Sequence, residues 1–404
     1  MKVLYVNNQV RLGGAETVVQ QLRRGFPQSQ LAIADGKIFP PEVQPLYPRW
    51  LARLYHSRLH RFVEGLAPRA RWTDRAFRQL AEAPCDLIHL HNFHGRYATL
   101  ESLAYLIRRK PLVWTFHALW GVTGGCDHPR DCRRYLDACG DCPQLGRWPL
   151  SKRDDTAEKL AAKLAHLAPL PLHVVAPSRW LADIVRNSPV GRNWRVHHIP
   201  NAVDAAFSTL LEKTPHVERE APTILIVNRN FRDEQKGFPL IQSALAAAAT
   251  QPNPRPRLML VGENSDWARQ RLAEWSCEAF GYVSDLATLA RLHREADIFL
   301  FASPAENFPC VVLEAMAAGS CVVATPTGGV VEQIENGVSG ILAAEISGPA
   351  LGAALQRALS DAALRRKLGD AARARAAHDF AEALFLKRHD RLYSEILETW
   401  RPPS

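Results

Sequence analysis

The chain has 404 residues, more than one ordinary hydrophobic core organises, so we expect two domains of about 200 residues each. A hydrophobic content of 47% with a mean hydropathy of -0.18 is typical of a globular protein, and no apolar run reaches the length of about 18 residues that indicates a membrane-spanning helix. The formal net charge of +9 favours anionic partners, among them phosphorylated small molecules and acidic lipid headgroups.

The first predicted strand is the short apolar run of residues 2–8. It ends at Asn7-Asn8, too early for a secretory signal, so we expect a cytoplasmic protein. Gly13 and Gly14 follow, and apolar residues then recur at helical spacing. Such a glycine turn either lets backbone amides approach a phosphate or a sugar, or simply connects the strand to the helix. It is not the dinucleotide-binding fingerprint, since no third glycine follows.

A basic stretch covers residues 49–71. Six arginines stand there against a single acidic residue, Glu64, and apolar residues are interleaved with them. The pattern predicts either a basic amphipathic helix on an anionic membrane surface or a solvated helix whose apolar side packs on its own domain. The first alternative would place the protein peripherally on the inner face of the cytoplasmic membrane. No RNA-binding aromatic platform or nuclease-like acidic set is recognisable, so we expect no nucleic acid partner.

Two later strands end in histidine. Residues 86–91 end in His91 and residues 111–117 end in His117, while His94 lies just beyond the first of them. The carboxyl ends of parallel strands share one edge of a sheet, which is where open α/β sheets bind ligands. These histidines are therefore candidates for a functional role, with structural hydrogen bonding as the alternative.

Half of the cysteines are concentrated in an insertion at about residues 124–145. Four of the eight lie within seventeen residues. A Cys-x-x-Cys pair with a second pair nearby is the pattern of a tetrahedral zinc site, and a reducing cytosol argues against disulfides. The first pair has five residues between its members, a wider spacing than usual. The sequence leaves two interpretations, a structural zinc ion or reduced thiols packed in a loop, for Cys126, Cys132, Cys139 and Cys142.

A polar, charged stretch over residues 212–220 marks the expected domain boundary. It separates a domain at 1–212 from a second one at 213–380, in which strand and helix patterns alternate again. Repeated strand and helix units predict an α/β fold with two parallel, doubly wound sheets, and two such domains imply a cleft. The last segment, 381–404, has the apolar spacing of an amphipathic helix and on its own indicates a terminal packing helix.

Two cations stand near the start of the second domain. Arg229 ends its first predicted strand, and Lys236 precedes its first predicted helix. Guanidinium, ammonium and the helix dipole all attract negative charge, so this arrangement favours a bound diphosphate. The alternative is that Lys236 is an ordinary surface residue. A Walker A sequence is missing from the chain, which argues against a hydrolysed nucleoside triphosphate.

Two glutamates follow the predicted strand at residues 298–302. Glu306 lies where the strand gives way to a helix, and Glu314 lies about a turn into that helix, with seven residues between the two. Together they would offer two acceptors to one crevice. The plainer interpretation is that Glu306 complements the helix dipole and Glu314 is solvated.

In combination these motifs resemble a known family, the retaining GT-B glycosyltransferases of family 4. The residues that carry the resemblance are Gly13-Gly14-Ala15-Glu16, Ile199-Pro200-Asn201, Arg229 with Lys236-Gly237, and Glu306 with Glu314. The end of the cysteine-rich insertion, from Cys139 to Leu145, resembles the colanic acid and exopolysaccharide subgroup of that family.

The resemblance implies a GT-B fold, in which two Rossmann-like domains face each other across a cleft and 381–404 crosses back to the first domain. Residues 1–212 would bind the acceptor, a glycan or a lipid-linked oligosaccharide, and residues 213–380 would bind a UDP or GDP sugar. Transfer would proceed with retention and without a metal cofactor. The alternatives on this architecture are a nucleotide-sugar epimerase and a noncatalytic sugar-nucleotide-binding protein.

The resemblance also implies roles for individual residues. Arg229 and Lys236 would hold the donor diphosphate and stabilise its charge as the glycosidic bond breaks. Glu306 would contact the donor sugar, Glu314 would accept hydrogen bonds from the ribose, and His117 would lie near the reacting sugar. The remaining donor-binding positions are Gly13, Gly14, Asn307 and Phe308.

Overall fold

The computed structural model describes residues 1–10, 13–34, 40, 42–55, 69–93, 98–215, 220–248 and 256–402. His94 and most of the basic stretch at 49–71, namely residues 56–68, lie outside the described residues. Among the helices that are described, none is long and apolar enough to cross a membrane.

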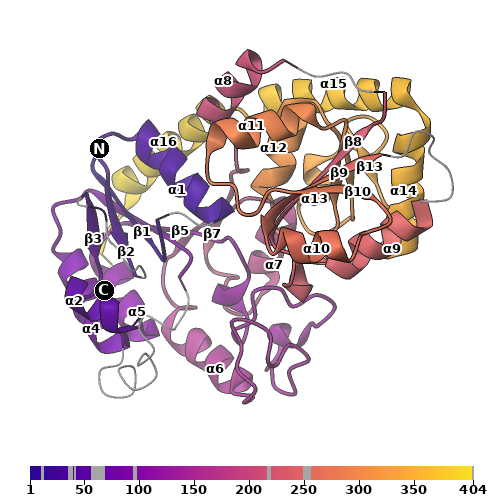
Figure 1. The fold of residues 1–404 in the computed structure, drawn as a ribbon. Helices are drawn as coiled ribbons and strands as arrows, with labels where there is room; N and C mark the ends of the chain where they lie inside the picture. The colour runs from indigo at the N-terminus through magenta and orange to yellow at the C-terminus, as the bar shows by residue number, and fades with distance from the viewer. Residues whose placement is uncertain are drawn as a thin grey trace. The chain divides into compact units, whose positions relative to one another are not determined.

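The chain divides into two compact units. The first comprises Met1–Ile199 together with Leu386–Ser404, and the second comprises Pro200–Phe385. The division at residues 199 and 200 precedes the boundary expected at 212, which falls within helix α8 (Ala205–Lys213). Each unit contains one parallel sheet, labelled in Figure 1.

The first sheet has the strand order β3-β2-β1-β4-β5-β6-β7, and every neighbouring pair is parallel. Its strands are β1 (Val3–Asn7), β2 (Gln30–Ile33), β3 (Val43–Pro45), β4 (Leu87–His91), β5 (Leu112–Thr115), β6 (His173–Ala176) and β7 (Arg195–His198). Its helices are α1 (Gly14–Gly25), α2 (Arg49–Tyr55), α4 (Arg69–Ala81), α5 (Leu100–Arg109), α6 (Thr156–His166) and α7 (Arg179–Asn187). The predicted cap of α7 is confirmed, because Ser178 Oγ accepts a hydrogen bond from the Leu181 amide at 3.1 Å.

Alternate residues of β4 face two different environments. Ile88 and Leu90 lie in the main apolar core of the first unit, whereas His89 and His91 point to the opposite face, since side chains alternate along a strand. There His89 Nδ1 lies 2.6 Å from the hydroxyl of Tyr393. Tyr393 belongs to α16 (Glu382–Thr399), so the C-terminal helix covers this face with a polar contact at its centre.

The second sheet has the order β10-β9-β8-β11-β12-β13, again with parallel neighbours. Its strands are β8 (Thr223–Asn230), β9 (Arg257–Glu263), β10 (Ser276–Ala279), β11 (Ile298–Phe301), β12 (Cys321–Ala324) and β13 (Ile341–Leu342). Its helices, besides α8, are α9 (Phe238–Ala248), α10 (Ser265–Gln270), α11 (Leu286–Glu295), α12 (Cys310–Ala318), α13 (Val330–Gln333), α14 (Gly348–Ser360) and α15 (Ala362–Asp379).

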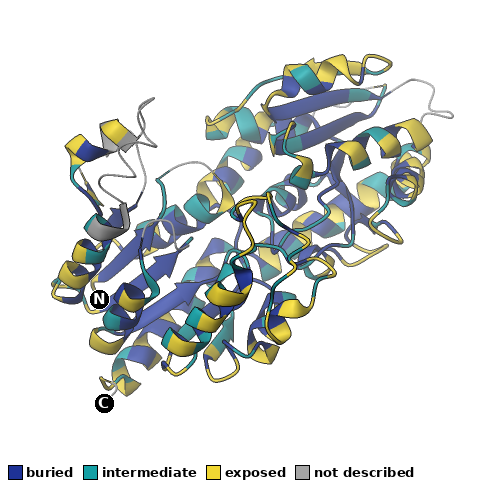
Figure 2. Cartoon of the chain, turned by 90° about the horizontal axis from the view of Figure 1, so that it is seen from below, coloured by how far each residue is buried: buried dark blue, intermediate teal, exposed yellow. Residues whose placement is uncertain are grey.

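Both faces of this second sheet are covered. Ile298 and Leu300 of β11 pack in one apolar cluster, while Phe299 and Phe301 pack in another on the opposite face. Figure 2 shows the resulting pattern, in which strands are buried and helices expose only their outer sides. A sheet covered on both faces has continuously apolar strands, which explains why the runs of these residues predict strands so clearly. The doubly wound α/β architecture expected for both units is therefore confirmed.

Candidate functional site

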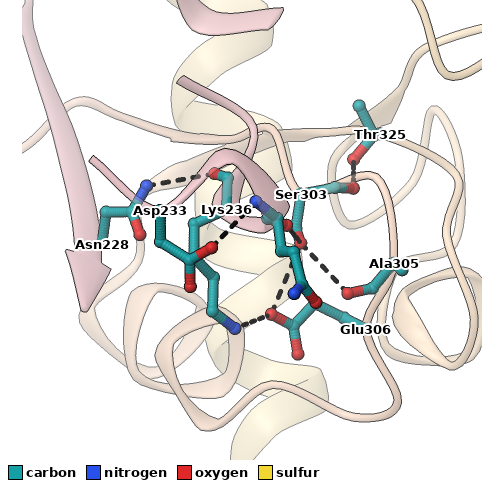
Figure 3. A network of polar contacts seen from close by, with 8 residues as sticks. Asn228, Asp233, Lys236, Ser303, Ala305, Glu306 and Thr325 are labelled. Atoms are coloured by element: carbon teal, nitrogen blue, oxygen red, sulfur yellow. Dashed lines mark hydrogen bonds and ion pairs between the residues drawn. The ribbon is translucent and has the colours of Figure 1, made fainter. Parts of the chain in front are cut away.

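The centre of the candidate site is an ion pair between Lys236 and Glu306 in the second unit. Lys236 closes the 3₁₀ turn η3 (Glu234–Lys236), which follows β8, and Glu306 follows β11, the neighbouring strand. The Lys236 Nζ lies 2.7 Å from Glu306 Oε1. A dashed line in Figure 3 marks this contact. The two side chains remain 31% and 18% exposed, so a ligand can reach both.

The turn before Lys236 is held by its own polar groups. The Asp233 side chain accepts a hydrogen bond from the Gln235 amide at 2.9 Å and so caps η3. Asn228 Nδ2 donates to the carbonyl oxygen of Lys236 at 3.0 Å and ties the end of the turn back to β8. Both contacts are drawn in Figure 3. The lysine therefore starts from a fixed backbone position.

Gly237 brings this turn against the end of β11. Its φ of 74° lies in the left-handed region, and a Cβ at this position would overlap the carbonyl oxygen of Ala302. Only glycine meets both requirements without strain. The close approach explains how residues 70 positions apart in sequence, Lys236 and Glu306, form a direct contact.

Ser303 supports the glutamate from the other side. Its hydroxyl lies 3.4 Å from Glu306 Oε1 and 3.2 Å from the carbonyl oxygen of Ala305, and its own carbonyl accepts from Thr325 Oγ1 at 2.7 Å. Because Thr325 directly follows β12, the loop carrying Glu306 is anchored to two strands. This anchoring positions the carboxylate before any ligand arrives.

The charges at this edge favour an anionic ligand. Glu306 raises the pKa of Lys236 above its ordinary value, burial opposes that effect, and Arg229 lowers the pKa slightly. Lys236 is therefore protonated at neutral pH. Arg229 is exposed near the end of β8, close enough to be felt electrostatically by the lysine. Two cations and one carboxylate thus share the carboxyl edge of the sheet, which is the arrangement predicted for a diphosphate.

Glu314 is not the solvated helix residue of the plainer interpretation. Its side chain on α12 is only 15% exposed, and burial, followed by the charge of Asp204, raises its pKa to about 7. Among the described residues Glu314 Oε2 has no hydrogen-bond partner. A buried polar atom of this kind is uncommon in a folded protein and suits a hydroxyl supplied by a ligand.

His293 is a neighbour of Glu314 that sequence reasoning missed. Its Nε2 lies 3.8 Å from Glu314 Oε2, and its fully buried ring packs near Phe207 and Phe299. Burial lowers the pKa of His293 to about 3, so the imidazole is neutral and the contact is not an ion pair. The sequence could have indicated that His293 is buried, because it lies on α11 seven residues after Leu286 and therefore on the apolar stripe of that helix.

Asn307 and Phe308 are buried rather than presented to a ligand. Each is only 4% exposed. The carbonyl of Asn307 accepts from the Gly329 amide at 2.7 Å, and the carbonyl of Phe308 accepts from Asn201 Nδ2 at 2.9 Å. These two residues shape the entrance to α12, and their backbone is the part that remains for a donor contact.

In the first unit, His91 and His117 form a stacked pair. Nδ1 of His91 lies 3.0 Å from Nε2 of His117, and the rings are 25° from parallel. Burial lowers the pKa of His117 to about 4 and that of His91 well below its ordinary value, so both are neutral at pH 7. One ring must therefore donate to the other, which fixes the tautomers of the pair.

The predicted glycine turn is exposed at the beginning of α1. Gly13 is the N-cap residue and Gly14 begins the helix. Glu16, which sequence reasoning used only as part of a motif, accepts a hydrogen bond from Asn92 Nδ2 at 3.2 Å. Glu16 also accepts from Asn7 Nδ2 at 3.4 Å. Because Asn7 ends β1 and Asn92 follows β4, this carboxylate links the ends of two adjacent strands.

The four clustered cysteines line one small cavity in the first unit. All eight cysteines are described and none forms a disulfide. Burial raises the pKa of Cys126 to about 12 and also raises the pKa of Cys139 and Cys142. These three groups are therefore thiols at neutral pH in the absence of a cation.

Of the basic stretch, the structure describes α2 and the beginning of α4. Trp50 on α2 is 61% exposed, and its ring meets that of Trp72 edge to face at 6.4 Å. The choice between a membrane-facing and a self-packing helix depends on residues 56–68, so it remains a prediction.

Family models match both halves of the chain. The model described as Glycosyltransferase Family 4 matches residues 12–207, and the model described as Glycosyl transferases group 1 matches residues 210–375. Arg229, Lys236, Glu306 and Glu314 all fall within the second match.

Two named relatives match this chain over more than half of its length. A protein of Escherichia coli (strain K12) named as the colanic acid biosynthesis glycosyl transferase WcaC is 27% identical over 252 residues. That alignment covers 59% of this chain and 59% of the relative, less than two thirds of its length. The phosphatidyl-myo-inositol mannosyltransferase of Mycobacterium tuberculosis (strain H37Rv) is 25% identical over 330 residues, covering 78% of this chain and 74% of that protein.

Solved structures share the architecture of nearly the whole chain. Sucrose-phosphate synthase from Thermosynechococcus elongatus has a TM-score of 0.70 at 20% identity, covering 99% of this chain and all of that one. Anabaena HepE in complex with UDP-glucose has a TM-score of 0.67 at 20% identity, covering 98% of this chain and all of that one. These likenesses confirm the GT-B fold class.

Proposed function

Because the chain belongs to the glycosyltransferases, with a family 4 first half and a group 1 second half, we propose that it transfers a sugar from a nucleoside-diphosphate sugar to a glycan acceptor. The single observation that carries the proposal is the Lys236–Glu306 ion pair with Arg229 at the same sheet edge. It offers cations to a diphosphate and a carboxylate to sugar hydroxyls.

We assign the nucleoside-diphosphate to the second unit on three grounds. Arg229 is exposed and Lys236 is partly exposed, so both cations are available to phosphate oxygens. Glu314 holds a buried oxygen that has no hydrogen-bond partner among the described residues and suits the ribose. The solved HepE structures contain UDP and UDP-glucose, which supports a uridine nucleotide as the first donor to test.

In the proposed reaction the bond between the anomeric carbon and the diphosphate breaks, and the electron pair leaves with the phosphate oxygen. Arg229 and Lys236 stabilise the negative charge that develops on this leaving group. The acceptor hydroxyl attacks from the face that the diphosphate leaves, and its proton passes to a phosphate oxygen, so configuration is retained. Since two protein cations supply the stabilising charge, we expect turnover without an added divalent metal.

The first unit contributes groups that are themselves uncharged. His117 is neutral and fixed by His91, so it can hydrogen-bond a hydroxyl without carrying charge. Gly13 and Gly14 expose backbone at the start of α1, where amides can approach a phosphate. The names of the relatives favour a polysaccharide or lipid-linked acceptor, and such an acceptor would suit a protein held peripherally on the inner membrane face.

A ligand screen followed by a transfer assay tests this function. The purified chain is heated with nucleoside-diphosphate sugars, beginning with UDP-glucose, and we expect a raised melting temperature with at least one of them. Glu314→Ala should abolish that protection. The protecting donor is then incubated with and without lipid-linked glycan fractions, and sugar transfer should require the acceptor. No protection by any nucleotide sugar would contradict the proposal, and turnover without an acceptor would indicate an epimerase.

A further inference from the structure

The loop between β5 and α6 carries four cysteines that line one small cavity. Cys126, Cys132, Cys139 and Cys142 line the same cavity, which has a volume of about 10 Å³. That is room for a single water-sized atom. The wide spacing of the first pair does not prevent all four from lining one cavity.

The Cys139–Cys142 turn is built in an unusual backbone conformation. Cys139, Gly140 and Asp141 have φ angles of 54°, 93° and 43°, a run that non-glycine residues rarely adopt. The Arg134 guanidinium holds it by donating to the carbonyl oxygens of Gly140 at 2.7 Å and Asp141 at 2.8 Å. These two hydrogen bonds therefore hold a strained turn that positions the sulfurs of Cys139 and Cys142.

Backbone amides point at two of the sulfurs. The Gly124 amide hydrogen-bonds Cys139, and the Gln144 amide hydrogen-bonds Cys142. Donors aimed at sulfur favour the thiolate form and orient it, as groups around metal ligands commonly do. Gly124 must lack a side chain here, because its Cβ would lie 2.9 Å from Cys139 Sγ.

We propose that these four cysteines bind one structural Zn²⁺ ion. Four sulfur ligands on a short loop with a Cys-x-x-Cys element match the tetrahedral thiolate sites that zinc prefers. Within the described part of the chain no group of three or more His, Cys, Asp or Glu side chains is placed so that it could hold a metal ion without moving. Binding therefore draws the thiol groups inward by side-chain rotation and releases their protons, because zinc coordinates thiolates.

The ion would brace the segment that follows His117. The Leu119 amide donates to the carbonyl of Asp127 at 2.9 Å, which joins the chain after β5 to the cysteine-rich loop. From α6, the buried Lys163 ammonium donates to the carbonyl oxygens of Trp120 and, at 2.8 Å, Thr123. A zinc ion at the four sulfurs completes this bracing, so its removal should loosen the loop beside His117.

Elemental analysis of the purified full-length chain tests the proposal, with a matched control. We expect about one zinc per wild-type chain. Cys142→Ser should lose most of it, while Cys85→Ser, which changes another half-buried thiol of the first unit outside the cavity, should keep it. If Cys142→Ser fails to fold, wild-type protein gives two further readouts. Cobalt exchanged into the site should show thiolate charge-transfer absorption, and titration with a mercurial should release the zinc as about four thiols react.

Several results would overturn the zinc site. They are wild-type protein purified from zinc-containing medium with well under one zinc per chain, iron in place of zinc, or equal zinc loss in Cys85→Ser and Cys142→Ser. A Cys139–Cys142 disulfide found under non-reducing conditions would also overturn it. None of these measurements depends on glycosyl transfer, so they test the zinc site independently of the proposed function.

Discussion

The carboxyl edges of the two parallel sheets differ in the charge of the side chains that they present. At the second sheet, charged groups are accessible, with Arg229 exposed and Lys236 joined to Glu306 at 2.7 Å. At the first, two imidazoles are neutral: His91 is buried, His117 is half-buried, and Nδ1 of His91 lies 3.0 Å from Nε2 of His117. The same topology thus provides one edge suited to a charged ligand and another suited to hydroxyl groups.

This difference follows from what surrounds each edge. Glu306 counterbalances the charge of Lys236, so a protonated amine is stable despite partial burial. No carboxylate is hydrogen-bonded to the His91–His117 pair among the described residues, and burial, followed for His91 by the neighbouring histidines, keeps both rings neutral. We infer that the second unit manages the diphosphate charge and that the first unit contributes orientation rather than charge.

The largest effect is expected from removing the cation at the charged edge. Lys236→Met should lower kcat/KM by about 100- to 1,000-fold, the usual effect of losing one group that stabilises a leaving charge. It also leaves Glu306 without its ion-pair partner. Steady-state transfer rates check this, with Lys367→Met, an exposed lysine on α15, as the control expected to retain activity. Equal rates in the two variants would remove the distinction between the edges.

The next effect concerns stability and pH at Glu314. Burial raises its pKa from 4.5 to about 7, so the folded protein binds this proton more tightly than the unfolded chain does. The contribution of this bound proton to the free energy of unfolding is complete below pH 4.5. It is lost progressively as pH rises through 7, by up to about 3 kcal/mol. Glu314→Gln lacks this titration, so it should gain stability relative to wild type between pH 5 and pH 8.

Urea unfolding of both proteins at pH 5, 6, 7 and 8 checks the Glu314 prediction. A stability difference between wild type and Glu314→Gln that stays constant across that range would show that the carboxyl group has an ordinary pKa in the folded state. Such a result would return Glu314 to the class of solvated helix residues.

A smaller effect is expected at the neutral edge. His117→Ala should lower kcat by about tenfold to a hundredfold, since a hydrogen bond to a polar group is lost, while nucleotide affinity stays within about twofold. Because the pKa of His117 is about 4, its protonation should not reduce the wild-type rate above pH 5. Titration of UDP into the variant, beside the rate measurement, separates the two effects. Lost UDP binding with an unchanged kcat would contradict the assignment of charge handling to the second unit.

The last prediction concerns stability rather than catalysis and compares two glycines of similar backbone conformation. Gly237 and Gly281 have φ angles of 74° and 67°, but only a Cβ at Gly237 meets another atom, the Ala302 carbonyl. Both alanine variants should lose about 1 kcal/mol from left-handed strain, and Gly237→Ala should lose a further 1–3 kcal/mol from the overlap. Thermal unfolding checks the difference. Equal melting temperatures would show that the turn is not tightly held against β11.

The two sheets were predictable from sequence because each buried strand is a nearly continuous apolar run, as in Val3–Asn7 and Ile298–Phe301. The burial of Glu314 was not predictable from sequence, because α12 is apolar nearly all round and has no polar face by which exposure could be judged. The Lys236–Glu306 contact depends on β8 and β11 being neighbours, which strand order in the chain does not reveal. His293 and Glu16 escaped notice because their importance arises from neighbours that only the fold supplies.

The central claim is that the second unit binds a diphosphate through its cations, and calorimetric titration with UDP and UMP tests it most directly. Wild-type protein should bind UDP at least tenfold more tightly than UMP, because the second phosphate meets Arg229 and Lys236. In Lys236→Met the preference for UDP should shrink while UMP affinity stays close to that of wild type. An equal preference for UDP in both proteins would contradict the account.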